Sequence, residues 1–328
     1  MKALVGVDIG GTKTAVVLGR LAEREPEILD RQAFPTEHGR GHGPVVDRIC
    51  STARAMLASR SVPSGDLAGI GISCGGPLDS RRGLVLSPPN LPEWRRVPIV
   101  DLVSRALGAP ARLQNDANAC AVAEWRFGAG RGCQSMVFLT FGTGMGAGLI
   151  LDGRLYEGPS DLAGEVGHIR LAEDGPEGYG KRGSFEGFCS GGGIARLARE
   201  EAERRLAAGE AAAFCPDRQG LEGITAQAVA EAAAHGDASA RRVLVQSGRW
   251  LGRGLAVLVD VLNPERIVIG SIYARCREFL EPGMREELAR EALGPSVAAC
   301  AVVPAGLGEA IGDCASLVLA MSAAGGEG

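Results

Sequence analysis

Residues 5–19 read VGVDIGGTKTAVVLG, and this stretch decides the fold class. Two apolar runs flank a short polar centre that contains a carboxylate, two glycines, a threonine and a lysine. Short apolar runs bounded by glycine are typical of buried strands, so the stretch predicts a tight hairpin. Glycines at its tip allow backbone N–H groups to approach an anion, and the threonine adds a hydroxyl donor. The hairpin therefore predicts a phosphate-binding turn at Gly10, Gly11, Thr12 and Lys13.

An acidic residue stands at the end of the first apolar run. Magnesium in proteins usually keeps several waters and takes one or two carboxylates. We therefore expect Asp8 to hold Mg²⁺, directly or through water. Taken alone, the same string of residues also fits an ordinary glycine hairpin with no phosphate ligand.

A second stretch, residues 136–154, repeats the pattern of strand, glycine-rich turn and strand. Its turn includes Thr143, Gly144 and Gly146, and we expect these residues to form a second phosphate-binding turn. The spacing is not that of a P-loop, and a strand rather than a helix follows, which argues against a dinucleotide fingerprint. The duplication predicts an α/β protein of two similar lobes whose turns face one cleft.

Length, composition and charge support this interpretation. A chain of 328 residues fits one large domain or, more naturally, two of medium size. A chain with 45% hydrophobic but only 4% aromatic residues can build the core of packed α/β layers from aliphatic side chains. The net charge of −4, without long like-charge runs, argues against nucleic acid or an anionic membrane as partner.

Neither a bilayer span nor a leader peptide is visible, since no run reaches the ~18–20 apolar residues that a span needs. The nine cysteines are odd in number, scattered and never spaced C-x-x-C, so we expect reduced thiols. Together these features predict a cytoplasmic protein whose partners are small molecules.

The remaining elements follow from periodicity and composition. We expect strands at 67–73 and 266–269, helices at 118–125, 194–208, 226–234, 239–262 and 308–321, and loops at 87–94 and 173–193. Asn115 and Asp116 precede the first of these helices, and either would be a good N-cap.

Seven motifs together resemble the ROK sugar kinases, within the superfamily of sugar kinases, heat-shock chaperones and actin. They are VDIGGTKT, GISCGGPLD, SPPNLPEW, QNDANACAVAEW, LTFGTGMGAGLILDGRLYEG, GEVGHIRL and NPERIVIGS, and they span nearly the whole chain. The resemblance implies a two-lobed, actin-like ATPase (ribonuclease H-like) fold with the active site in the interlobe cleft. We expect lobes at 1–117 and 118–307, with a helix at about 308–324 packing back on the first.

The resemblance also implies the roles of individual residues. Asp116 would be the base that takes the proton from a sugar hydroxyl. The sugar would contact Asn90, Asn115, Asp116, Glu165, His168 and Glu186, and the adenosine of ATP would lie by Gly270 and Ser271. Phosphoryl transfer needs positioning, charge neutralisation and an acceptor for that proton, which a carboxylate supplies. An internal ion pair is the alternative for Glu165 and His168, but flanking glycines favour sugar contacts.

One departure from the family's pattern concerns zinc. The family commonly follows this histidine with C-x-C-G-x-x-G-C-x-E, and the histidine and three cysteines bind a structural zinc ion. Here the aligned stretch EGYGKRGSFE, residues 177–186, puts Glu177, Tyr179 and Ser184 at the cysteine positions. Structural zinc without a thiolate would be atypical.

Cys189 cannot replace three missing thiolates, so we expect no structural zinc. His168 is then available to the sugar, and packing of Tyr179 and Phe185 would hold the loop at 173–193 instead.

The sequence thus predicts ATP-dependent phosphorylation of a hexose or amino-sugar hydroxyl, glucokinase-like, with Mg²⁺. Three alternatives stay open: a repressor of the same family, a sugar sensor without catalysis, and another ATPase of the superfamily. The family's repressors carry an N-terminal helix-turn-helix, and a hairpin beginning at Val5 leaves no room for one. Glucose is the most economical substrate because the set of polar residues matches glucose-type recognition, and a homodimer is common in the family.

Overall fold

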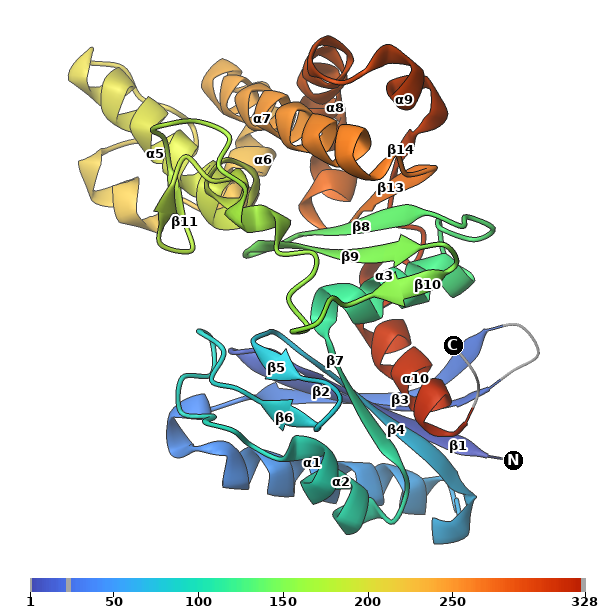
Figure 1. Ribbon diagram of the computed structural model, residues 1–328. Helices are drawn as coiled ribbons and strands as arrows, with labels where there is room; N and C mark the ends of the chain where they lie inside the picture. Colours follow the sequence, from blue (N-terminus) through green and yellow to red (C-terminus); the bar gives the residue numbers. More distant parts are fainter. Residues whose placement is uncertain (1, 22–24, 326–328) are drawn as a thin grey trace. The chain divides into compact units, whose positions relative to one another are not determined.

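The computed structural model describes residues 2–21 and 25–325 (Figure 1), so Met1, where the first expected lobe begins, lies outside it. Contacts between Cα atoms divide the chain into two compact units. Unit 1 comprises Met1–Gln134, Gly148–Ala163 and Gly306–Gly328, and unit 2 comprises Ser135–Ala147 and Gly164–Ala305. These units have other bounds than the lobes expected at 1–117 and 118–307, which stay a prediction.

Unit 1 is built on a five-stranded sheet. Its strands are β1 (Ala3–Ile9), β2 (Lys13–Leu21), β3 (Pro26–Pro35), β4 (Leu67–Cys74) and β7 (Ala111–Asn115), in the order β3-β2-β1-β4-β7. The hairpin predicted from the sequence is confirmed, since β1 pairs antiparallel with β2 and Val7 lies opposite Val16. The pairs β1–β4 and β4–β7 are parallel.

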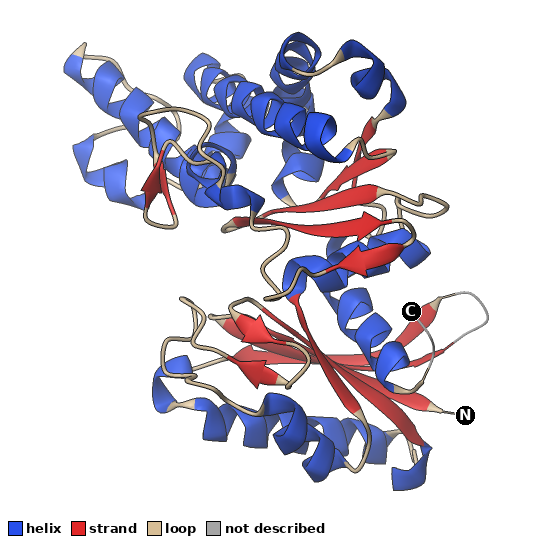
Figure 2. Ribbon diagram, in the orientation of Figure 1, coloured by secondary structure: helices blue, strands red, loops and turns tan. Residues whose placement is uncertain are grey.

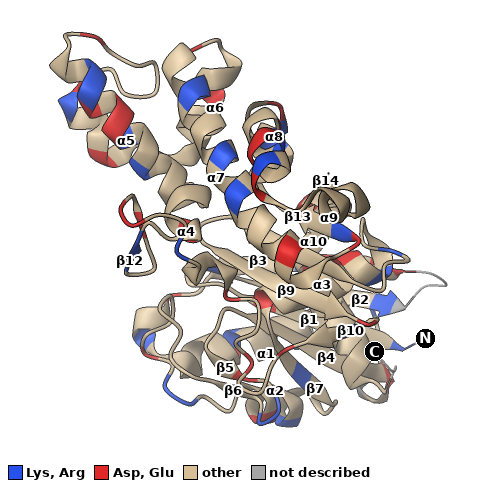
Figure 3. Ribbon diagram, turned by 45° about the horizontal axis from the view of Figure 1, so that its top comes forward, with Lys and Arg blue, Asp and Glu red and all other residues tan. Residues whose placement is uncertain are grey.

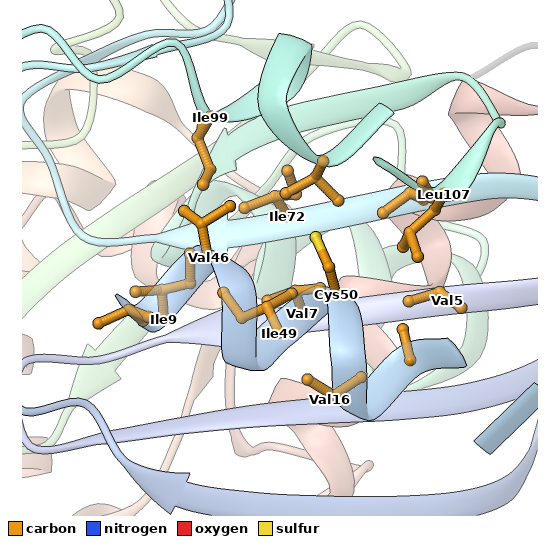
Figure 4. Packing of buried hydrophobic residues seen from close by; sticks show 14 of the residues in the cluster. Val5, Val7, Ile9, Val16, Val46, Ile49, Cys50, Ile72, Ile99 and Leu107 are labelled. Carbon is orange, nitrogen blue, oxygen red and sulfur yellow. The ribbon is translucent and has the colours of Figure 1, made fainter. Parts of the chain in front are cut away.

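Side chains of successive residues in β1 point to opposite faces of this sheet, because side chains alternate along a strand. Val5, Val7 and Ile9 are fully buried in a core that includes residues of α1 (His42–Ser59) and α2 (Ile99–Leu107), as Figure 4 shows. Leu4 packs on the other face, against Leu317 of α10 (Ile311–Ala323). The apolar run that predicted a buried strand therefore fills both faces.

Helix α10 lies directly against β1 and β4 because small residues line its contact. A Cβ on Gly6 would collide with the side chain of Ser316, and one on Gly71 with the carbonyl oxygen of Ser316. A third strand residue on this face, Asp8, lies beside Gly312: a Cβ there would be 3.3 Å from Asp8 Oδ2. Close packing thus brings the first turn of α10 to the Asp8 carboxylate.

A second five-stranded sheet has the same order when its strands are counted along the chain. It consists of β8 (Met136–Phe141), β9 (Met145–Leu151), β10 (Arg154–Tyr156), β13 (Arg266–Ile269) and β14 (Ala301–Pro304), in the order β10-β9-β8-β13-β14. In both sheets the third strand is at one edge and the first is in the centre. The topology therefore agrees with the internal duplication inferred from the two glycine-rich turns.

The helices of unit 2 gather around the long helix α7 (Ala238–Leu262), which contacts α4 (Phe185–Cys189), α5 (Gly191–Ala207), α6 (Ala226–Ala234) and α8 (Ile272–Glu291). Figure 2 shows this helical part of the unit, which also includes α9 (Gly294–Ala299). Helices α7 and α8 pack backbone to backbone, because Cβ atoms on Gly248 and Gly252 would collide with carbonyl oxygens of α8. Arginine and glutamate residues are interspersed along α5 and α8, seen as blue and red segments in Figure 3, so neither helix carries one sign of charge.

Most elements expected from periodicity are present. The predicted bounds of α6 and β13 are those observed, and α3 (Asp116–Phe127), α5 and α7 begin within three residues of the expected positions. The uninterrupted loop expected at 173–193 is wrong. That segment contains a hairpin of β11 (Glu177–Gly178) and β12 (Lys181–Arg182), then α4, because its glycines serve turns and close contacts such as that of Gly187 with Pro176.

The short elements complete the fold: β5 (Leu78–Asp79), β6 (Leu84–Val85), and 3-10 turns that include η1 (His38–Arg40) and η3 (Val166–His168). Across residues 2–21 and 25–325, none of the helices combines the length and the apolar character that a membrane crossing demands.

Candidate active site

The first glycine-rich turn, in unit 1, is tight, and hydrogen bonds from a residue outside the turn hold its backbone. The amide of Gly10 donates to the carbonyl of Lys13 over 3.0 Å. Thr36, just after β3, donates its hydroxyl to Gly10 O and its amide to Thr12 O, at 2.7 and 3.0 Å. The side chains of Thr12 and Lys13 are exposed. The turn therefore has a fixed backbone and presents a hydroxyl and an ammonium group to solvent.

The loop that carries Asn90 lies against this turn. A Cβ on Gly11 would be 2.7 Å from Asn90 Cβ, so only glycine permits the approach. A Cβ on Gly75, just after β4, would be 3.6 Å from Asn90 Nδ2, and one on Gly76 would be 3.4 Å from Asn115 Nδ2. The predicted sugar residues Asn90 and Asn115 thus flank one glycine pair in unit 1.

Asp116 is the first residue of α3, and its neighbours cap the helix. The N-cap is Asn115, whose Oδ1 accepts from Ala117 N at 2.9 Å, and Asp116 Oδ1 accepts from the same amide at 2.8 Å. Asp116 remains accessible to solvent. Desolvation by the surrounding protein nevertheless raises its pKa, against the hydrogen bond from Ala117. Because Asn115 caps the helix, the Asp116 carboxylate can serve another purpose.

Gln114 is a buried neighbour that sequence reasoning missed. Its Oε1 accepts from Asn115 N at 2.7 Å and from Asn118 Nδ2 at 3.1 Å, and its Nε2 donates to Glu157. It therefore holds the chain on both sides of Asp116. The signal in the sequence was a polar residue directly before Asn115, but the partner of Gln114, Glu157, is distant in the chain.

A second carboxylate, Asp8, interacts electrostatically with Asp116. Desolvation is the main cause that raises the pKa of Asp8 to about 6, the negative charge of Asp116 adds to the rise, and a hydrogen bond with Ser73 opposes it. Asp313, at the start of α10, also raises the pKa of Asp8, while Arg31 lowers it. Carboxylates that repel one another in this way suit a divalent cation, which favours oxygen ligands.

The second glycine-rich turn, in unit 2, is closed by main-chain bonds and by Glu186. Gly142 N donates to Gly144 O at 3.2 Å, and Met145 N donates to Glu186 Oε2 at 3.0 Å. The amide of Gly146 donates to Thr140 Oγ1 at 2.9 Å, so it is committed within the strand pair. Glu186, a predicted sugar residue, therefore lies at the predicted phosphate turn.

Unit 2 also contains a cavity of about 1010 Å³ beside this turn. Thr143 and Ser271 line it, together with the first residues of α5 and α8 and one face of α6. Long helices attract anions at their N-termini because unpaired N–H groups and the helix dipole point there. Sequence reasoning missed the lining residues of α6 and α8, including Ala230, Glu231 and Arg275.

Ser271 has backbone angles that few residues other than glycine adopt, with φ at 50° and ψ at −108°. It follows Gly270, whose amide donates to Leu139 O at 3.0 Å, and it is the N-cap of α8. Strain of this kind persists where the surrounding structure enforces it, and it is common at ligand sites. The two residues expected at the adenosine thus form a constrained turn at the cavity.

Glu165 and His168 stand before and at the end of η3, also in unit 2. His168 is half-buried, and its ring meets that of Tyr179 edge to face with centroids 4.9 Å apart. Its carbonyl accepts from Lys181 Nζ at 2.6 Å. Neighbouring residues therefore fix both the backbone and the ring of His168.

The positions where the family pattern has cysteines make other contacts. Ser184 Oγ accepts from Gly187 N at 3.1 Å, which caps α4, and donates to Gly178 O at 3.3 Å. Phe185 is fully buried against Gly254 of α7. Within residues 2–21 and 25–325, no group of three or more His, Cys, Asp or Glu side chains could hold a metal ion.

The chain is similar over most of its length to proteins of known activity or structure. A glucokinase of Halalkalibacterium halodurans is 33% identical over 90% of this chain and 87% of its own length. The crystal structure of a ROK-family glucokinase from Streptomyces griseus, in complex with glucose and AMPPNP, is 32% identical, with a TM-score of 0.78 over 98% of this chain and 99% of that one. A xylose repressor of Caldicellulosiruptor bescii is 33% identical over 87% of this chain and 69% of its own length. The model of the ROK family matches residues 4–322, and the chain therefore belongs to the ROK family.

Proposed function

We propose that this chain is an ATP-dependent sugar kinase that phosphorylates glucose or a closely related hexose, with Asp116 as the general base. The glucokinase relatives, which match most of the chain at about 33% identity, support the sugar kinase activity. Glucose remains the first choice because a solved relative at 32% identity was crystallised with it. An amino sugar is the second choice.

The observation that supports the mechanism is the raised pKa of Asp116, together with the accessibility of this residue. A general base works best when its pKa lies near the operating pH, and desolvation moves the pKa of this carboxyl group upward. The residue is accessible, and Asn115 rather than Asp116 is the helix cap. Asp116 would take the proton of the attacking hydroxyl as the bond to the phosphoryl group forms. Gln114 would keep the Asp116 backbone in place.

ATP would be bound by the glycine-rich turns and by the cavity of unit 2. The turn at Gly10, Gly11, Thr12 and Lys13 and the turn at Thr143 and Gly144 would hold phosphates, with Gly270 and Ser271 at the adenosine. The charge of Lys13 and the N-termini of α5 and α8 favour the phosphates. Gly146 would act through the shape of the turn, since its amide is bonded to Thr140.

Magnesium would be held by Asp8, directly or through water. The pKa of Asp8 is raised partly by the neighbouring carboxylates, and a divalent cation would relieve that repulsion. When bound, the ion would neutralise charge that develops on the phosphoryl oxygens. Asp8 would position the ion, and the first turn of α10 would shield the Asp8 carboxylate from solvent.

The sugar would be oriented by Asn90, Asn115, Glu165, His168 and Glu186. Amides, carboxylates and an imidazole offer the mixed donors and acceptors that neighbouring hydroxyls need. We further propose that the protein acts in the cytoplasm, where ATP is supplied, and that it forms a homodimer.

The test is an ADP-release screen over about twenty sugars, with the mass of each phosphorylated product determined. We expect turnover with glucose or a close relative. Sugar binding without turnover would favour the sensor, and ATP hydrolysis that ignores every sugar would favour another ATPase of the superfamily. Light scattering at several protein concentrations tests the dimer.

A further inference from the structure

The turn between β11 and β12 breaks a rule of hairpin chemistry. Gly178 pairs with Lys181, so Tyr179 and Gly180 form a two-residue turn, and both have positive φ, 48° and 72°. Such turns strongly prefer asparagine, aspartate or glycine at the first position, because a bulky side chain is strained there. Tyrosine at this position therefore needs a reason other than the turn itself.

Burial in a core does not supply that reason. Tyr179 is 56% exposed, which makes it one of the most exposed large hydrophobic side chains among the described residues. The contact that its ring does make is with His168: the two rings meet edge to face at 87°, with centroids 4.9 Å apart. Aromatic rings prefer this geometry because the positive edge of one faces the negative face of the other.

The same hairpin also holds the backbone of His168. Lys181 lies directly after the turn, and its Nζ donates to the carbonyl oxygen of His168 at 2.6 Å. The other strand of the hairpin is held next to the turn by Ser184, whose hydroxyl donates to Gly178 O at 3.3 Å. A strained turn, a ring contact and an ammonium contact therefore converge on one histidine.

We propose that Tyr179 is a positioning residue for the sugar, acting through the imidazole of His168. The ring of Tyr179 keeps the imidazole in the orientation in which its nitrogen meets a sugar hydroxyl, and Lys181 keeps the main chain of His168 in place. This inference rests on the proposed role of His168 as a sugar ligand. It gives the hairpin tip a role in sugar affinity and none in the chemistry of transfer.

The test uses the strain of the turn. The turn favours asparagine, aspartate or glycine at position 179, whereas the contact with His168 needs an aromatic ring. Tyr179→Asn supplies the side chain that the turn prefers, so the melting temperature should hold or rise. The KM for the sugar should nevertheless increase roughly 3- to 10-fold, the loss expected for one aromatic contact. The KM for ATP and kcat should change less than twofold. Tyr179→Phe retains the ring and should restore the KM for the sugar.

A double-mutant cycle separates this proposal from the function on which it rests. His168→Ala should raise the KM for the sugar, and adding Tyr179→Asn to it should cause no further rise. If the two effects multiply, or if Tyr179→Asn alone leaves the KM unchanged, the positioning role is wrong while the kinase stands. If His168→Ala leaves the sugar KM unchanged, His168 is not a sugar ligand and the proposal falls with that role. Absence of turnover with any sugar in the wild-type protein would instead overturn the proposed function.

Discussion

At the scale of single residues, the start of α3 allows one carboxylate to be tested with a closely matched control. Asp116→Asn keeps an oxygen that can accept from Ala117 N but removes the ability to take a proton. We expect kcat to fall by something like 10²–10⁴-fold with ATP affinity nearly unchanged, because loss of a general base acts in the transition state. Steady-state kinetics and nucleotide titration provide the measurement.

Asp101→Asn is the control, because Asp101 also lies in the first turn of a helix in unit 1. It should leave kcat unchanged. Near wild-type turnover of Asp116→Asn would remove this residue from the mechanism.

Asp8 offers a test of stability, because the buried carboxylate that the proposed activity needs also destabilises the folded protein when it is ionised. Its pKa is about 6 in the folded protein against 3.8 for an aspartate free in water, so the folded state binds the proton more tightly. The stability that this contributes is fully present below pH 3.8 and is lost as the pH rises through about 6. Two pKa units correspond to at most about 3 kcal/mol.

Asp8→Asn should therefore raise the free energy of unfolding at pH 8 by about 1–3 kcal/mol and lose activity. The gain should shrink as the pH is lowered from 6 towards 4, where wild-type Asp8 becomes protonated. Urea denaturation of both proteins at several pH values measures the difference. A variant less stable than wild type at pH 8 would contradict the assignment of the raised pKa.

At the scale of elements, the contact of α10 with the first sheet depends on glycine. A Cβ on Gly71 would collide with Ser316 O and Ala320 N, which are backbone atoms and cannot turn away. Gly71→Ala should cost about 1–3 kcal/mol or more in the free energy of unfolding, as overpacking does. Gly43→Ala in α1 adds the same methyl group where nothing lies within 4 Å, so it should be neutral or slightly stabilising. Equal stabilities of the two variants would refute this packing.

How far each element could be predicted depends on its length and periodicity. Helix α6 and strand β13 were predictable to the residue because composition and apolar spacing agree over the whole segment. Strands β11 and β12 have two residues each, too few to show a period, and their turn carries a tyrosine where turn chemistry favours asparagine. Local pattern therefore indicated a loop at 173–193.

The candidate site was predictable to a similar extent. The glycine-rich turns and the residues around Asp116 lie in continuous motifs, so they could be named from the sequence. The contacts of Gln114 with Glu157 and of Thr36 with Gly10 join distant positions that no motif connects. The same is true of the helices that line the cavity of unit 2, because packing rather than sequence spacing brings them together.

The hairpin of β11 and β12 also leads to a prediction about zinc. Protein purified without chelator should contain well under one zinc ion per chain, because none of its cysteine-equivalent positions offers a thiolate. EDTA should stop catalysis only by removing Mg²⁺, and added Mg²⁺ should restore it. Elemental analysis and activity before and after chelation are the measurements, and stoichiometric zinc would overturn the alignment of residues 177–186.

At the scale of the whole molecule, the proposed ligands of each substrate are shared between the units. Asn90, Asn115 and Asp116 belong to unit 1, whereas Glu165, His168 and Glu186 belong to unit 2. A sugar that binds all six residues must couple the two units. The phosphate turns are divided in the same way, so binding of one substrate should affect binding of the other.

Coupling is needed because water competes with the sugar for the phosphoryl group. Water is far more abundant, and a site that is complete without sugar would hydrolyse ATP. We expect sugar alone to make the particle more compact in small-angle scattering. We also expect ATP hydrolysis without sugar to be at least ~10²-fold slower than transfer to sugar, the scale of discrimination that induced fit supplies. Asp116→Asn should still become compact, since it retains the hydrogen-bonding groups and loses only the base. Superimposable scattering curves with and without bound sugar, together with rapid hydrolysis in its absence, would contradict this coupling and favour an ATPase of another kind.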